Sequence, residues 1–460
     1  MQDWMQNWST REWGIAGAAV FILIVVLFTT INSEVLSDRE AGPLVDAVFD
    51  EVTAQGGVMA TRDGSLKQVR VYVDRTLSMR PFTTPGQSPY FDLLEGLDAL
   101  LAGKIQFRGF GYPSEEEGQV VKSADPVLLE EASQYTFVNN DYGPLFSSLS
   151  PQKTHLVVSD GVQSEPTQGE RFGEIVTSIG GWIKKGGVFS LVAFRAPYRG
   201  TYYHEEPTVG KMEYSCDNRP FYIFGFFPSV EAKKELLDIL ESGEVSPFYT
   251  LTVGEASASV RARASKPPED PTAPRGPRVL TAFNRHGESS PEVNHVYSGR
   301  PAKKNGSVSP LQFTVTFDST SALWSRLSTD ATKRVARSLD PSFRHWRIDT
   351  LSISQENVSL TPLRTPELVE ATAQTGKSSR TARLETSLSF TPEQRMRLAS
   401  LLTVGVSAAG ANSLIPDALS ARRDDRASAC SRTLNIQPMM GVILREHYVL
   451  GRALLVTEWM

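Results

Sequence analysis

Two carboxylates and two hydroxyls stand where strand-like runs of the sequence end. In "VRVYVDRTLSM" (residues 69–79) an alternating apolar run stops at Asp74, and Thr76 and Ser78 follow at alternate positions. A second apolar run, "THLVVSDG", ends at Asp160. Side chains at the carboxyl ends of parallel strands face the crevice where ligands bind, so we expect the two carboxylates to meet there. Carboxylate and hydroxyl oxygens suit Mg²⁺ or Ca²⁺ and not a metal that prefers thiolates.

The elements that must position these groups alternate between strand and helix over residues 68–253. This alternation is typical of an α/β fold with a mostly parallel sheet and helices on both faces. Strand patterns occupy residues 68–74, 104–111, 153–161, 187–194 and 220–227, and helix patterns occupy residues 89–103, 143–149, 171–186 and 229–243.

With these motifs and this order, residues 68–253 resemble the von Willebrand factor A domain family and its metal-ion-dependent adhesion site. That family ends its first strand with Asp-x-Ser-x-Ser and its central strand with an apolar run and Asp-Gly. "DRTLSM" and "LVVSDG" match these patterns, with Thr76 in place of the first Ser. The resemblance implies a Rossmann-like fold in which Thr76 and Ser78 coordinate the metal directly. Asp74 and Asp160 would hold it through water or as close partners.

The chain departs from the family pattern in the middle loop. The threonine that the family places there falls on Gly143, which has no ligand atom, so Asp141 is the candidate for the missing oxygen. A third carboxylate would neutralise the ion and weaken its attraction for an acidic residue of a partner. Either the site binds metal without an acidic partner, or it is degenerate. A further alternative is that Asp-x-Thr-x-Ser is a turn that satisfies backbone amides.

Residues 195–219 form an insertion between two strand patterns and begin at the carboxyl end of the first. We therefore expect the insertion to lie near the metal face. Tyrosine and arginine are enriched at protein interfaces, so this insertion is the predicted partner-binding surface. The alternative is a surface hairpin that packs its own tyrosines. The candidate residues are Arg195, Tyr198, Arg199, Tyr202, Tyr203 and Tyr214.

The N-terminal residues 1–33 predict a membrane anchor. Residues 14–31, "GIAGAAVFILIVVLFTTI", are 18 residues without a charge, close to the length that spans a ~30 Å hydrocarbon layer. A cleaved signal peptide is the rival, but no basic cluster precedes this run and no A-x-A site follows it. We expect a single-pass inner or plasma membrane protein with its bulk on the extracytoplasmic side.

The rest of the chain predicts supporting segments. Residues 34–67 contain an amphipathic helical segment, and residues 254–310 include the proline-rich "SKPPEDPTAPRGPR", which predicts a linker or crossover. Residues 311–460 predict a β-rich C-terminal domain, in which "TPEQRMRLASLL" (391–402) has the pattern of a capped helix.

Composition limits the classes of function. The formal net charge is −5 without a long block of one sign, which does not suggest a nucleic-acid partner. The only cysteines, Cys216 and Cys430, form either one disulfide or two buried thiols. The chain has no HExxH or GxSxG motif. Two hypotheses follow: a membrane-anchored interaction component of an envelope assembly, and a metal-dependent hydrolase in which Asp74 or Asp160 positions a metal-activated water.

Overall fold

The structure is a computed structural model of the 460-residue chain. It describes residues 47–48, 51–52, 66–83, 88–114, 116–162, 168–203, 211–255, 258–262, 278–283, 294–297, 311–317, 327–352, 357–363, 368–375, 381–388, 398–415, 419 and 436–458. The predicted membrane segment, residues 14–31, lies outside the described residues. Within them, no helix is long and apolar enough to cross a bilayer.

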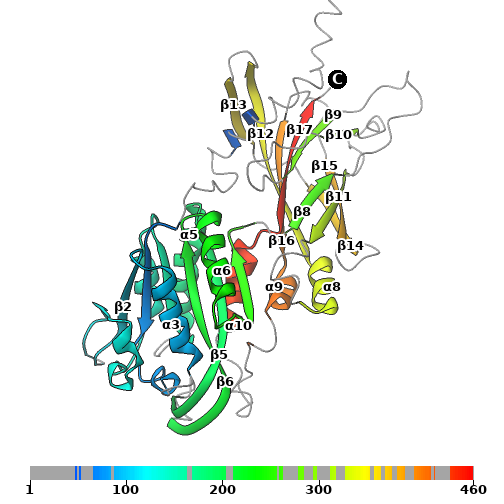
Figure 1. The fold of residues 1–460 in the computed structure, drawn as a ribbon. Coiled ribbons are helices and arrows are strands. Elements are labelled where there is room, and N and C mark those ends of the chain that lie inside the picture. Colours follow the sequence, from blue (N-terminus) through cyan, green and yellow to red (C-terminus); the bar gives the residue numbers. More distant parts are fainter. Residues whose placement is uncertain are drawn as a thin grey trace, which may run out of the picture.

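A seven-stranded sheet with helices packed on it forms the first part of the molecule (Figure 1). The strand order is β3-β2-β1-β4-β6-β5-β7. Its elements are β1 (Val69–Asp74), η1 (Arg80–Phe82), α3 (Pro89–Leu100), β2 (Ile105–Gly111), β3 (Val120–Ser123), η2 (Val127–Glu130), η3 (Ala132–Gln134), α4 (Tyr142–Ser147), β4 (Thr154–Ser159), α5 (Gln168–Lys184), β5 (Val188–Tyr203), β6 (Lys211–Phe227), α6 (Val230–Ser242) and β7 (Tyr249–Val253).

The centre of this sheet is parallel. Strand β1 pairs in parallel with β2 on one side and with β4 on the other, with Val69 opposite both Ile105 and Thr154. The predicted α/β class with a parallel centre is therefore confirmed. Strands β5 and β6 form one long antiparallel hairpin, and β6 pairs antiparallel with β4. A chain that returns directly through a hairpin must reverse direction, so this side of the sheet is mixed.

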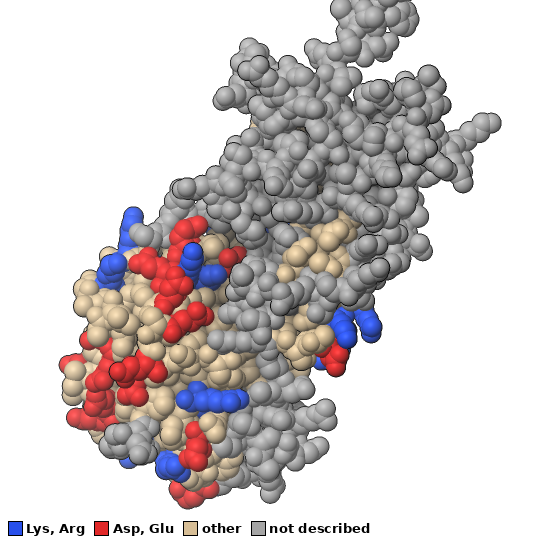
Figure 2. All heavy atoms as spheres, turned by 45° about the vertical axis from the view of Figure 1, so that its right-hand side comes forward, with Lys and Arg blue, Asp and Glu red and all other residues tan. Residues whose placement is uncertain are grey.

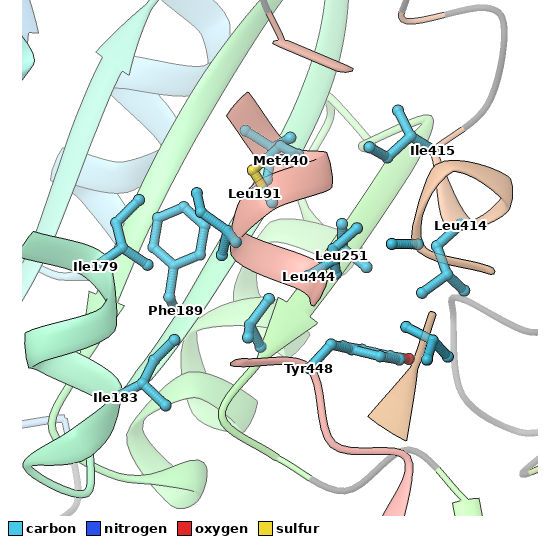
Figure 3. Packing of buried hydrophobic residues seen from close by; sticks show 14 of the residues in the cluster. Ile179, Ile183, Phe189, Leu191, Leu251, Leu414, Ile415, Met440, Leu444 and Tyr448 are labelled. Atoms are coloured by element: carbon cyan, nitrogen blue, oxygen red, sulfur yellow. The ribbon is translucent and has the colours of Figure 1, made fainter. Parts of the chain in front are cut away.

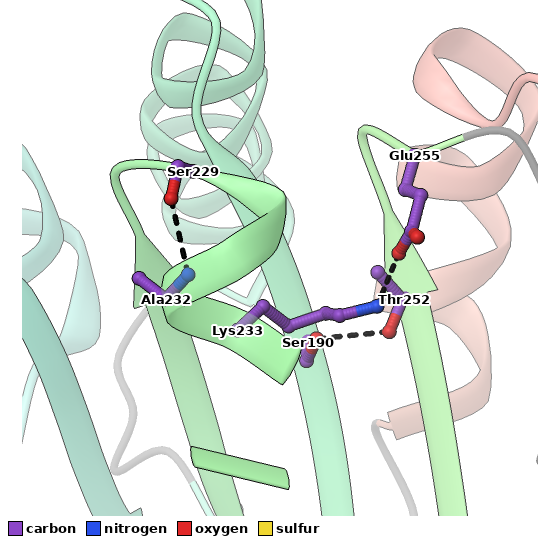
Figure 4. A network of polar contacts seen from close by, with 6 residues as sticks. All are labelled: Ser190, Ser229, Ala232, Lys233, Thr252 and Glu255. Atoms are coloured by element: carbon purple, nitrogen blue, oxygen red, sulfur yellow. Dashed lines mark hydrogen bonds and ion pairs between the residues drawn. The ribbon is translucent and has the colours of Figure 1, made fainter. Parts of the chain in front are cut away.

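Local sequence explains why these elements form. Strand β1 is an almost continuous apolar run because both of its faces are covered. Helix α3 begins with Pro89 at its first turn and buries the stripe that includes Tyr90, Leu94 and Leu97. Helix α6 begins at Ser229, whose hydroxyl accepts a hydrogen bond from Ala232 N at 3.1 Å (Figure 4).

Polar contacts tie the last helix and strand of this part together. Lys233 of α6 forms an ion pair with Glu255, which follows β7 (Figure 4). The hydroxyls of Ser190 and Thr252 lie 2.9 Å apart across the β5–β7 ladder. These contacts hold β7 at the edge of the sheet.

Residues 258–458 contribute two further sheets, a six-stranded one in the order β10-β9-β17-β16-β12-β13 and a four-stranded one in the order β14-β15-β11-β8 (Figure 1). Their strands and helices are β8 (Ala258–Ala262), β9 (Arg278–Phe283), β10 (Asn294–Tyr297), β11 (Leu311–Phe317), α8 (Thr329–Arg337), β12 (Leu339–Ser352), β13 (Asn357–Leu363), β14 (Leu368–Thr375), β15 (Thr381–Leu388), β16 (Leu398–Val406), α9 (Ala408–Leu414), α10 (Ile436–His447) and β17 (Gly451–Glu458).

Two sequence predictions for this region are wrong. Residues 254–310 are not only a linker, because β8, β9 and β10 lie within them and pair into the two sheets. The predicted helix 391–402 is contradicted at its C-terminal end, where Leu398 begins strand β16. Strand β16 lies between β12 and β17 in the six-stranded sheet, and this pairing overrides the helical preference of its leucines.

Helix α10, near the end of the chain, packs on the first part of the molecule. Met440 and Leu444 lie against Leu191 of β5 and Leu251 of β7 (Figure 3). These residues belong to one buried apolar cluster that also extends into the strands of residues 258–458. The α/β part therefore completes its core with a helix that follows it by about two hundred residues in the sequence.

Part of the predicted amphipathic segment 34–67 is also described. Ala47, Val48, Glu51 and Val52 are helical, and both Val48 and Val52 are fully buried. A spacing of four residues places the two valines on one face of a helix. The burial of both valines shows that this face of the segment is covered.

Candidate functional site

The two predicted carboxylates meet at the carboxyl ends of adjacent parallel strands. Asp74 is the last residue of β1, and Asp160 follows the last residue of β4. Their exposed fractions are 0% and 1%. The predicted convergence of Asp74 and Asp160 is therefore what the topology produces, and both side chains are buried.

Asp74 accepts hydrogen bonds at both carboxylate oxygens. Thr76 N donates to Oδ1 at 3.0 Å. Asn140 Nδ2 donates to Oδ2 at 2.5 Å, and Ser159 Oγ donates to the same oxygen at 2.7 Å. The sequence reasoning did not include Asn140 or Ser159. Ser159 could have been predicted from the sequence, because it stands directly before Asp160 in the "LVVSDG" motif.

Thr76 and Ser78 bring their hydroxyls together as predicted. Thr76 Oγ1 and Ser78 Oγ lie 2.9 Å apart. Two neighbouring ligands of an octahedral Mg²⁺ ion, each at about 2.1 Å from the metal, would be about 3.0 Å apart. The oxygen donors thus fit a divalent cation in type and in spacing. Thr76 and Ser78 would hold it, with Asp74 and Asp160 beside them.

Asp141 is the residue predicted to supply the missing oxygen ligand. Its Oδ1 accepts a hydrogen bond from Gly143 N at 3.0 Å, so that Asp141 is the N-cap of α4. The neighbouring Asn140 contacts Asp74 instead. Among the described residues, no group of three or more His, Cys, Asp or Glu side chains is arranged to hold a metal ion.

Burial and mutual repulsion govern the two carboxylates. Burial, followed by the charge of Asp160, raises the pKa of Asp74 to about 6. Burial also raises the pKa of Asp160, and this rise is opposed first by the positive charge of Arg219 and then by the hydrogen bond from Val162 N. The pair is thus charged at a free-energy cost, and a nearby cation lowers that cost.

Arg219, on β6, is the positively charged residue that most lowers the pKa of Asp160. The sequence analysis did not include it. Its side chain is fully buried. Its guanidinium carbon lies 4.8 Å from the ring centroid of Tyr202 and 5.7 Å from that of Tyr198. The hydroxyl of Tyr198 donates to the carbonyl oxygen of Ser78 at 3.3 Å. The β5–β6 hairpin therefore packs directly on the loop that follows β1.

The predicted partner-binding residues separate into two groups. Tyr198 and Tyr202 have exposed fractions of 0% and 5%, which corrects their assignment to an exposed surface. Both rings pack within the hairpin because Arg219 and the ring of Tyr214 lie against them. The self-packed hairpin is the arrangement found for these two tyrosines.

Arginines form the exposed part of the same hairpin. Arg199 is exposed, donates to Ser215 Oγ at 2.5 Å and forms a 2.6 Å ion pair with Asp217. Arg195 is also exposed, and its guanidinium carbon lies 4.2 Å from the ring centroid of Phe248. Tyr214 is half-buried, and the side chain of Tyr203 lies outside the described part of the structure.

Charged side chains are mixed over the visible surface of the α/β part. In Figure 2, acidic side chains gather over much of the described face, and basic side chains stand among them singly or in small groups.

On β6, Cys216 is disulfide-bonded. The sequence contains one other cysteine, Cys430.

Comparison of the chain with protein-family models, with curated proteins and with solved structures gives no match.

Proposed function

We propose that this chain is a membrane-anchored interaction component of a larger envelope assembly, and that its von Willebrand factor A-like part binds a protein partner. One observation carries the proposal. The Asp-x-Thr-x-Ser loop and the Ser-Asp-Gly turn converge at the ends of the parallel strands β1 and β4, and the β5–β6 hairpin packs on the same loop. Ligands of open α/β sheets bind at this end of the strands.

The oxygen cluster supports Mg²⁺ or Ca²⁺ as the cofactor. Thr76 and Ser78 would contact the ion, and Asp74 and Asp160 would lie beside it. A bound divalent ion supplies a local positive charge that an acidic side chain of a partner can approach. The residues of this chain hold that position and orient the loop.

The metal-dependent hydrolase alternative has weaker support. Such a site must let substrate and water reach the metal, and an open coordination position is typical. Here Asp74 and Asp160 are buried, and both oxygens of Asp74 already accept hydrogen bonds. This arrangement favours a structural or binding role for the carboxylates over catalysis.

Two further features support the proposed location. Residues 14–31 have the length and the uncharged composition expected of a membrane span. The disulfide at Cys216 favours an oxidising compartment, because structural disulfides persist outside the reducing cytosol. Both features support a location of the bulk of the chain on the extracytoplasmic side of the membrane. The two sheets of residues 258–458 would form the β-rich domain that supports the interaction domain.

The test is partner recovery from detergent-solubilised membranes with the full chain as bait and mass spectrometry as the readout. Arg199→Glu reverses a charge on the exposed face of the hairpin, and Arg445→Glu makes the same change at the exposed end of α10. We expect Arg199→Glu to reduce partner recovery and Arg445→Glu to leave it unchanged. Equal recovery with wild type and Arg199→Glu would argue against the hairpin as the contact surface.

A further inference from the structure

We propose that Arg219 and a divalent cation are alternative counter-ions for the Asp74–Asp160 pair, so that binding of the ion is coupled to the seating of the β5–β6 hairpin. This inference rests on the divalent-ion site of the proposed function and adds a regulating residue to it. The residue comes from the hairpin, which lies far from the Asp-x-Thr-x-Ser loop in the sequence and against it in space.

The first argument is the position of Arg219. Ser159, next to Asp160, lies opposite Tyr222 across the β4–β6 ladder, and Arg219 stands three residues before Tyr222 on the same strand. The arginine thus emerges from the sheet at the end where Asp160 lies, and it is fully buried there. A buried guanidinium requires a compensating negative charge. The positive charge of Arg219 stabilises the ionised form of Asp160, so Asp160 is that partner.

The second argument is the balance of charge. Two ionised carboxylates and one guanidinium leave one negative charge uncompensated. A divalent cation added to this set would leave one positive charge in excess, and the cation and the guanidinium would repel each other in a poorly solvated site. The ion therefore binds most favourably when Arg219 moves away from Asp160.

The third argument is that the arginine cannot move alone. Its guanidinium stacks on the rings of Tyr202 and Tyr198, and the hydroxyl of Tyr198 donates to the carbonyl of Ser78. Moving Arg219 disturbs these contacts between the hairpin and the loop that follows β1. Any partner that holds the hairpin in a displaced position would bind the ion-loaded form preferentially, because coupling between two binding events is reciprocal.

An arginine with only a structural role makes a different prediction, and Arg219→Met separates the two. Methionine keeps much of the length of the side chain and removes its charge. In both cases the variant should melt at a lower temperature than wild type in EDTA, since an uncompensated carboxylate remains buried. Only under the proposed competition does Mg²⁺ or Ca²⁺ restore the melting temperature, because the ion replaces the lost charge.

The experiment uses the full chain in detergent with Mg²⁺ or Ca²⁺ alone as the probe, and it measures melting temperature and calorimetric affinity. We expect Arg219→Met to bind the ion about tenfold or more tightly than wild type, as a coupling free energy of the usual size would give. Arg219→Lys, which keeps the charge, should retain the weak affinity of wild type. If Arg219→Met does not fold, Tyr198→Phe removes the hydroxyl contact with Ser78 and should tighten binding by a smaller factor.

Two results would overturn the inference. One is an affinity of Arg219→Met, or of Tyr198→Phe in its place, that is no tighter than that of wild type. The other is a loss of stability in Arg219→Met that neither ion restores. If no form of the protein binds either ion, the competition and the metal site fail together. Recovery of a protein partner by wild type under those conditions would still leave the interaction function standing.

Discussion

Replacing Tyr202 by alanine should destabilise the β5–β6 hairpin, because the tyrosine is part of the hairpin's own core. The side chain is 5% exposed. Its ring lies 4.8 Å from the guanidinium of Arg219 and 5.5 Å, between centroids, from the ring of Tyr214. The substitution removes both contacts and leaves a cavity next to a buried charge.

The magnitude follows from the truncation of a buried aromatic ring. Such changes cost ~3–5 kcal/mol, to which the lost cation–π contact adds on the order of 1 kcal/mol. If the α/β part unfolds as one cooperative unit, its melting temperature should fall on the order of 10 °C. Tyr202→Phe keeps the ring and should cost under about 1.5 kcal/mol. Arg199→Ala, which removes only an exposed ion pair, should cost about 1 kcal/mol or less.

The assay is calorimetric or fluorimetric melting of the three variants, combined with partner recovery at a temperature where each remains folded. We expect Tyr202→Ala to lose stability and to retain the partner wherever the hairpin is intact. The opposite pattern, a melting temperature within about 2 °C of wild type together with loss of the partner, would show that Tyr202 contacts the partner and is not part of the hairpin's core.

Three further predictions follow from single sites. Burial lowers the pKa of both His155 and His345 from 6.5 to about 4, so each histidine binds more protons in the unfolded chain than in the folded one within this range and contributes a loss of stability of up to ~3 kcal/mol as the pH drops through it. Urea denaturation across this range should therefore show a smaller loss of stability on acidification in His155→Phe than in wild type, and equal losses would contradict the assignment. Leu444→Ala on α10 should cost ~2–5 kcal/mol in thermal or chemical unfolding of the α/β part, and an unchanged midpoint would mean that α10 is not part of its core. Ser78→Ala removes the hydroxyl contact with Thr76 at a cost of about 1 kcal/mol and should abolish any Mg²⁺- or Ca²⁺-induced thermal shift, whereas a shift equal to that of wild type would exclude Ser78 as a ligand.

The sequence by itself determined the local elements of the α/β part. Apolar periodicity located β1, β4, α3 and α6 to within a few residues, because each of these elements buries a face that is written in its own sequence. It also placed Asp74 and Asp160 at one edge, since strands that run in parallel must end on the same side. The same reasoning placed the hairpin near the metal loop.

Only the tertiary structure decided what surrounds those carboxylates. Asn140 donates a hydrogen bond to Asp74, and Arg219 reaches the site from a hairpin whose strands insert between β4 and β7. A side chain's partner across the sheet depends on strand order, which periodicity does not encode. For the same reason the sequence predicted that Tyr202 is an interface residue, whereas its ring packs against Arg219.

Long-range packing also explains the misplaced helix and the domain boundary. Residues 398–402 have the leucine content of a helix, but hydrogen bonding to β12 and β17 on both sides makes them part of a central strand. The apolar face of helix α10 indicates that this face is buried, but it does not indicate which surface covers it. In the structure that surface belongs to β5 and β7. Local sequence specifies which faces must be buried, and the pairing of those faces is settled only when distant segments compete for the same surface.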